Sequence, residues 1–160
     1  MKSLTTELKW AFIFTVVALL WMVLEKLVGL HDEHIKYHMY LTNLFAIPAI
    51  IIIVLALKDK KQKDYNGRMT YKQGLISGII LSIFISMLSP LAQWVTTYII
   101  TPEYFPNVIA HAVETEYFED RAAAEAYFNY ENYAIQGAIF AFIMGVITTA
   151  ITMLFIKSKN

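Results

Sequence analysis

Four long stretches without a charged residue divide this chain of 160 residues. An α-helix rises about 1.5 Å per residue, so about 20 mostly apolar residues cross the roughly 30 Å of hydrocarbon in a bilayer. Three of the stretches meet this requirement directly. The first meets it only when flanking residues are included, with Glu25 and Lys26 extended toward the headgroups. The stretches cover residues 10–24, 39–57, 73–102 and 132–156.

A soluble helical core is the alternative to a membrane domain. Buried helices of soluble proteins usually keep one polar face, whereas residues 46–57 and 137–155 are apolar on every side. With 58% hydrophobic and 16% charged residues, the composition also suits a chain surrounded by lipid. We therefore expect an all-α fold, a four-helix transmembrane bundle that forms one domain over residues 1–160. The expected spans cover about residues 8–30, 39–57, 72–100 and 132–156.

The charges between the spans predict an orientation. With both termini in the cytoplasm, ten of the thirteen Lys and Arg residues lie on the inner side, and only Lys26, Lys36 and Arg121 lie outside. Basic residues in short loops resist translocation, so this imbalance favours both termini inside. The inner basic residues are Lys2, Lys9, Lys58, Lys60, Lys61, Lys63, Arg68, Lys72, Lys157 and Lys159.

The outer loop over residues 101–131 is the largest segment outside the spans. It carries seven acidic residues and one basic residue, Arg121. Thr101–Pro102 is typical of a helix start, and the segment from Arg121 to Phe128 is rich in helix-forming residues. We expect two short helices that form a periplasmic cap, the second either separate from the fourth span or continuous with it. Through its acidic charge, the loop is a candidate surface for a partner protein.

Small residues recur every fourth position in the third and fourth spans. Rows of this kind let two helix backbones approach closely. We expect the two rows to pack on each other within one chain; self-association into a homo-oligomer is the alternative. The row in the third span is Gly74, Gly78, Ser82 and Ser86, and the row in the fourth is Gly137, Ala141, Gly145 and Thr149.

Two prolines interrupt the backbone hydrogen bonding of the predicted spans. The third span has 30 uncharged residues, which would extend about 45 Å as a straight helix. Pro90 removes a backbone donor there and predicts a kink, and Pro48 raises the same expectation in the second span. Ordinary kinked packing and a hinge of a transport cycle are the two interpretations.

All four histidines lie on the predicted outer side. The spacing of His31, His34 and His38 places three imidazoles on one face if that segment is helical, and Glu114 follows His111 by one turn. Imidazole with carboxylate suits a divalent transition metal, and histidine can instead sense pH. These five residues are therefore the candidate metal ligands.

Few other residues carry chemistry. Glu25, Asn43 and Gln93 are the polar side chains that a transport pathway would use. No GxSxG, HExxH or paired buried carboxylates are visible, and cysteine is absent, so we expect neither catalytic residues nor a bound cofactor. Nothing in the sequence indicates nucleic-acid binding.

Residues 69–78 (MTYKQGLISG) and 98–105 (YIITPEYF) resemble domain-of-unknown-function family 4199. The resemblance covers nearly the whole chain: a basic start, four spans, an acidic third loop and a last span that ends in lysines. Because that family occurs mainly in Bacteroidota, the resemblance implies a bacterial inner membrane. It implies no activity.

The sequence favours a non-enzymatic scaffold or accessory subunit that binds membrane lipid or a partner protein. A small oligomeric transporter or channel is the first alternative. A metal-dependent enzyme, within the membrane or on its outer face, is the second.

Overall fold

A computed structural model describes residues 3–158 of the chain, all of whose regular structure is helical. Lys2 and Lys159, two of the basic residues assigned to the inner side, lie outside the described residues. Four helices are long and apolar enough to cross a membrane, and short helices lie between the third and the fourth. The expected all-α fold is therefore confirmed, and the chain is a multi-pass membrane protein.

The first two spans lie in the N-terminal 65 residues. Helix α1 (Thr5–Leu27) leads through a turn to α2 (Ile35–Leu41). A 3₁₀ turn, η1 (Thr42–Phe45), then joins α2 to α3 (Ala46–Tyr65), so the second span is continuous from Ile35 to Tyr65.

The remaining spans enclose the short helices. Helix α4 (Tyr71–Val95) ends in a π-helical turn, η2 (Thr96–Ile100). Helices α5 (Tyr104–Glu114) and α6 (Arg121–Tyr127) follow, and α7 (Tyr130–Ile156) is the last span.

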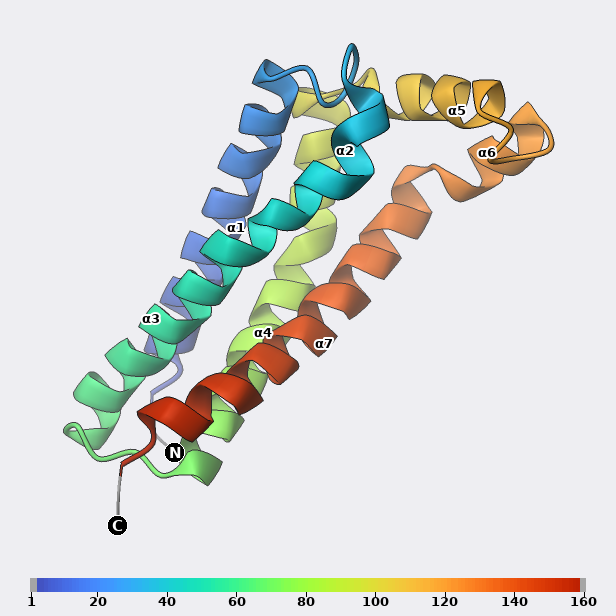
Figure 1. Ribbon diagram of the computed structural model, residues 1–160. Coiled ribbons are helices and arrows are strands. Elements are labelled where there is room, and N and C mark those ends of the chain that lie inside the picture. Colours follow the sequence, from blue (N-terminus) through green and yellow to red (C-terminus); the bar gives the residue numbers. More distant parts are fainter. Residues whose placement is uncertain (1–2, 159–160) are drawn as a thin grey trace.

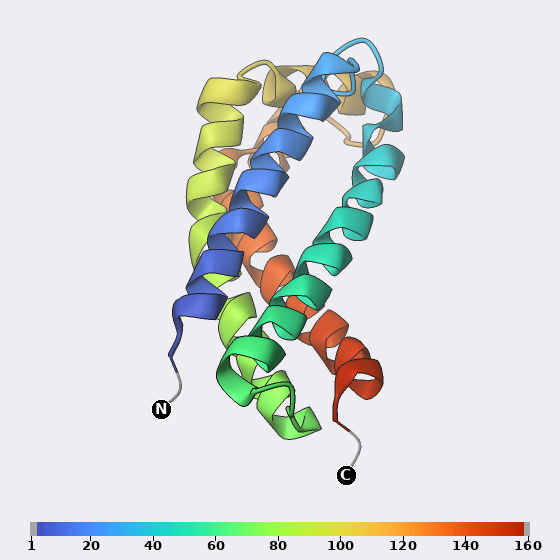
Figure 2. The same cartoon turned by 90° about the vertical axis from the view of Figure 1, so that its left-hand side faces the viewer.

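The four long helices run along one another (Figure 1). Helices α5 and α6 lie across the end where α1 finishes and α2 begins, which we call the cap end. Figure 2 shows that α1 begins and α7 finishes at the opposite end, which we call the terminal end.

The second span is longer than the uncharged stretch predicts. Helix α3 continues eight residues past Leu57 because its charged residues are compatible with a helix. Lys60 pairs with Asp64 and Lys63 with Asp59 at the i,i+4 spacing that stabilises helices. The chain then turns at Asn66 and Gly67, whose φ angles are 49° and 77°.

The short helices differ in detail from their predicted positions. Helix α5 begins at Tyr104, with Glu103 before it, so Thr101–Pro102 does not form the predicted helix start. Helix α6 is separate from α7. Asn129 stands between them and accepts a hydrogen bond from the Asn132 N–H at 2.9 Å, which caps α7.

Helix α4 packs more extensively on α7 than on any other helix. The two small-residue rows face each other there: Gly78 lies against Thr149, and Gly145 against Ser82. Ser86 donates a hydrogen bond from Oγ to the Ala138 carbonyl at 2.8 Å. Close backbone approach and side-chain hydrogen bonds thus join the two spans, as is usual for helices packed in lipid.

The prolines occupy different positions in their helices. Helix α4 continues through Pro90 and changes only at Thr96, where η2 begins. Pro48 is the third residue of α3, next to the 3₁₀ turn, where a missing N–H costs little.

A buried ion network joins three helices at the terminal end. Lys60 of α3 lies 3.0 Å from Glu7 of α1 and 3.0 Å from Asp64. Ser77 of α4 donates to the second carboxylate oxygen of Glu7 at 2.7 Å. Lys60 and Glu7 are each only 3% exposed, so their charges are satisfied by protein rather than water.

Gly78→Ala should destabilise the bundle by about 1–3 kcal/mol, because the added Cβ would overlap Thr149. Gly137→Ala is the matched control. Its Cβ would lie 3.3 Å from Ser89 Oγ, a tight contact that needs only a small shift of one hydroxyl, and Ala gains up to about 1 kcal/mol in helix propensity, so this variant should cost much less than Gly78→Ala. Thermal unfolding in detergent measures both, and equal stability of the two variants would contradict the packing.

Lys60→Met should destabilise the protein by about 3–5 kcal/mol, because it leaves the Glu7 carboxylate buried without its cation. Adding Glu7→Gln should recover part of the loss. Lys63→Met is the control: Lys63 is exposed, and its loss should cost less than about 1 kcal/mol. Denaturant titration of the purified protein measures these differences; similar losses for the two lysine variants would contradict a dominant role for the network.

Candidate functional site

A second buried polar cluster lies at the cap end, centred on Glu25. Glu25 is near the end of α1, and its side chain is 2% exposed. Trp21, one turn earlier, donates from Nε1 to Glu25 Oε1 at 2.5 Å. The other carboxylate oxygen, Oε2, therefore faces away from α1 with its own set of partners.

Two imidazoles converge on that oxygen. His31 Nε2 lies 3.2 Å from Glu25 Oε2, and His38 Nε2 lies 3.3 Å from it. The three ligand atoms all lie within 4.8 Å of one another, which makes this a group that could hold a metal ion.

The loop after α1 folds His31 back over Glu25. Gly29 has a φ of +77°, a conformation that other residues rarely adopt, and it turns the chain there. Leu30 then donates its N–H to the Glu25 carbonyl at 2.9 Å. Asn107 of α5 donates from Nδ2 to the His31 carbonyl at 2.9 Å, which ties the loop to the cap.

Tyr104 of α5 completes the cluster from the side of the cap. Its hydroxyl lies 3.3 Å from His38 Nδ1 and 3.5 Å from the Tyr133 hydroxyl. Burial raises the pKa of Tyr104 well above its ordinary value, so the group stays a neutral hydroxyl. The hydroxyl can accept a hydrogen bond from one neighbour and donate a hydrogen bond to another.

One buried polar atom of the cluster has no hydrogen-bond partner within the described residues. His31 Nδ1 and Thr149 Oγ1 are the buried side-chain polar atoms without a hydrogen-bond partner in residues 3–158. Lys26 does not compensate for Glu25, because its amine donates to the Ile100 carbonyl at 2.5 Å and lies 4.0 Å from Glu103.

The structure brings only two of the five candidate ligands together. Residues 31–34 form turns rather than a helix, so His31, His34 and His38 do not share one helical face. His34 is exposed and lies against Gly29. His111 and Glu114 lie on α5 and are not part of the cluster.

Three residues of the cluster were not among the predicted metal ligands. The sequence predicts Glu25 as a residue of a transport pathway, and it predicts neither Trp21 nor Tyr104 as part of a site. The i,i+4 spacing of Trp21 and Glu25 on a lipid-embedded helix is a signal that could have linked them. Nothing local in the sequence places Tyr104 beside His38.

The other two predicted transport residues have local partners. Asn43 donates from Nδ2 to the Met39 carbonyl at 2.8 Å and is exposed. Gln93 donates from Nε2 to Thr97 Oγ1 at 3.0 Å, within the same helical segment.

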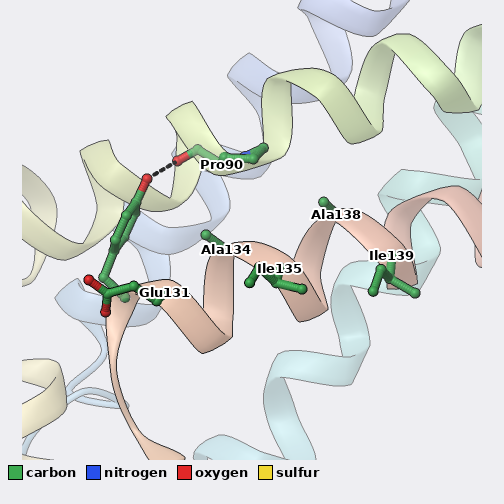
Figure 3. A pocket seen from close by; sticks show the side chains of 7 residues that line it. Pro90, Glu131, Ala134, Ile135, Ala138 and Ile139 are labelled. Atoms are coloured by element: carbon green, nitrogen blue, oxygen red, sulfur yellow. Dashed lines mark hydrogen bonds between the residues drawn. The ribbon is translucent and has the colours of Figure 1, made fainter.

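A separate hollow of about 420 Å³ lies between α4 and α7 toward the cap end. Figure 3 shows its floor along α7, with Pro90 of α4 opposite and Tyr130 donating to the Pro90 carbonyl at 3.3 Å. Its lining is apolar except at the cap end. The lining residues are Pro90, Tyr130, Glu131, Ala134, Ile135, Ala138 and Ile139.

A second hollow, also about 420 Å³, lies beneath the cap and shares Tyr130 and Glu131 with the first. Apolar residues of α5 line it together with Thr97, Glu125 and Asn129, so it is partly polar. An apolar groove and a partly polar recess thus lie next to each other.

Fold and hydropathy define the class: a helical multi-pass membrane protein with short helices across one end of its bundle. The chain belongs to the family described as "Protein of unknown function (DUF4199)", whose model matches residues 9–158. This match confirms the resemblance carried by residues 69–78 and 98–105. No curated protein and no solved structure matches the chain.

Proposed function

We propose that this protein is a non-enzymatic accessory protein of a bacterial inner membrane that holds a phospholipid beneath its cap. The observation that carries the proposal is the groove between α4 and α7, which shares Tyr130 and Glu131 with the recess under α5. An apolar groove beside a partly polar recess matches an acyl chain joined to a headgroup.

The groove suits lipid because of where it lies. Ile135 and Ile139 on its floor are 61% and 56% exposed, and both belong to a span that lipid surrounds. A lipid chain there would contact apolar side chains without having to displace water. The proposed occupant is therefore a lipid of the leaflet that faces the cap.

The recess favours a headgroup that carries an amine. Glu131 is exposed at the junction of the two hollows and makes no ion pair within the described chain. Glu125, the other acid of the recess, is paired with Arg121 at 2.7 Å. The Glu131 carboxylate can thus accept hydrogen bonds from an ammonium group, as in phosphatidylethanolamine.

The proposed orientation has both termini in the cytoplasm and the cap in the periplasm. Within residues 3–158, most of the Lys and Arg residues belong to the start of α1, the end of α3, the α3–α4 turn, the start of α4 and the end of α7. These segments lie at the terminal end (Figure 2), as expected for a cytoplasmic face. The α3–α4 turn, which includes Arg68, lies at that end as well.

Ala138→Phe should reduce lipid retention because the ring would occupy the groove. Ile147→Phe, at a lipid-facing position of α7 outside the groove, is the matched control. Wild-type protein and both variants would be taken from bilayers of phosphatidylethanolamine and phosphatidylglycerol, and bound lipid counted by native mass spectrometry.

The groove-filled variant should lose most of its bound phosphatidylethanolamine, while the control resembles wild type. Glu131→Gln should lower the preference for the amine lipid about fivefold, which corresponds to about 1 kcal/mol. Equal retention by all proteins, or co-purification of a protein with lipid-free wild type, would contradict the lipid assignment.

Reporter fusions test the orientation. A phosphatase that is active only in the periplasm should be active when inserted after Glu116 in the cap, and inactive when fused after Ser158. A fluorescent protein that folds only in the cytoplasm should give the reverse pattern. Phosphatase activity at Ser158 would overturn the proposed topology.

A further inference from the structure

We propose that Glu25, His31 and His38 bind a divalent first-row transition-metal ion of the Zn²⁺ type. Two imidazole nitrogens and one carboxylate oxygen are a donor set that such ions prefer, whereas Mg²⁺ and Ca²⁺ prefer oxygen donors alone. The three side chains come from α1, the following loop and α2. The site is independent of the lipid groove.

The distances fit a shared ion. Zn–N and Zn–O bonds of about 2.0–2.2 Å at tetrahedral angles place neighbouring ligand atoms about 3.3 Å apart. Glu25 Oε2 lies 3.2 Å from His31 Nε2 and 3.3 Å from His38 Nε2. Direct hydrogen bonds between imidazolium and carboxylate are shorter, about 2.7–2.9 Å. The two separations therefore match two edges of a coordination tetrahedron.

Surrounding residues orient two of the ligands. Trp21 engages Glu25 Oε1, so the carboxylate offers Oε2 as a single ligand atom. Tyr104 contacts His38 Nδ1; in the arrangement in which the hydroxyl accepts a hydrogen bond from Nδ1–H, Nε2 carries no proton and is free to coordinate. Supporting hydrogen bonds of this kind are usual around metal ligands.

Charge balance also favours a cation. Glu25 is buried in a helix end that lipid surrounds, and the neighbouring Lys26 contacts Ile100 and Glu103 instead. A buried carboxylate needs a compensating positive charge. A divalent ion supplies it while both imidazoles remain neutral, the form in which histidine binds metal.

His31 takes part in the cluster through one ring nitrogen only. Its side chain is 4% exposed, yet Nδ1 has no hydrogen-bond partner. Burying an imidazole with one nitrogen unpaired is unfavourable. Within the cluster the ring is engaged through Nε2, which lies 3.2 Å from Glu25 Oε2.

The site has room for exchange on the side of the cap. His38 is 17% exposed, and Asp32 and Glu33 in the adjacent turn are exposed to the same aqueous layer. Three protein ligands leave the fourth tetrahedral position open, as in zinc sites that bind water or a further ligand. The bound ion would connect α1, the loop and α2, and would reach α5 through Tyr104.

Cobalt titration tests the site directly. The full chain, purified in mild detergent without a histidine tag and stripped with a chelator, would be titrated with Co²⁺ and followed by visible absorption. We expect one Co²⁺ per chain with the strong ligand-field bands of tetrahedral geometry, and loss of those bands when Zn²⁺ is added. Absence of stoichiometric binding by wild-type protein would overturn the proposal.

The variants locate the ion. His38→Gln should abolish the tetrahedral spectrum, whereas His34→Gln, a nearby exposed histidine outside the cluster, should leave it unchanged. Tyr104→Phe should weaken Co²⁺ binding about tenfold by removing the partner of His38 Nδ1. Circular dichroism and gel filtration would verify that each protein is folded.

Two results would contradict the assignment even if wild type binds cobalt. One is an unchanged spectrum in folded His38→Gln; the other is loss of the spectrum in His34→Gln. The wild-type titration does not depend on any variant. It therefore tests the proposal even if one of the variants fails to fold.

Discussion

Lipid around the bundle offers no hydrogen bonds and no solvation of charge, and the rest of the structure depends on that constraint. Charged side chains therefore gather where the helices end and find partners in the protein. At the terminal end, Lys60 and Glu7 join α3 to α1. At the cap end, Glu25 meets His31 and His38. Between the two clusters the packing is apolar or depends on close backbone contact.

The two clusters differ in how completely their polar atoms are paired. The network around Lys60 satisfies both oxygens of Glu7 and holds three helices together. The cluster around Glu25 leaves His31 Nδ1 unpaired and brings together a carboxylate and two imidazoles that could hold a metal ion. Its residues also link the spans to the cap, because Tyr104 contacts His38. Occupancy of that cluster and the position of the cap should therefore be coupled.

Span number and helical class could be predicted because they depend on the length of uncharged stretches, a property of the sequence alone. The ends of the spans were harder to predict from the sequence. Helix α3 extends to Tyr65 since its charged residues form i,i+4 pairs, whereas hydropathy ended the span at Leu57. The histidine spacing indicated the correct segment, but the predicted geometry, three imidazoles on one helical face, was wrong. Gly29 turns the loop, so that His31 approaches Glu25 instead.

The sequence by itself determined that lipid would surround four helices and that charge would be distributed unequally between their ends, because transfer free energies depend on residue type and run length. Tertiary structure decided which polar groups meet. Glu25 and Tyr104 are far apart in the chain, and they join one cluster only because α1 ends, and α2 and α5 begin, at the cap end of the bundle. Contacts of that kind depend on helix register and loop direction, which no local pattern encodes.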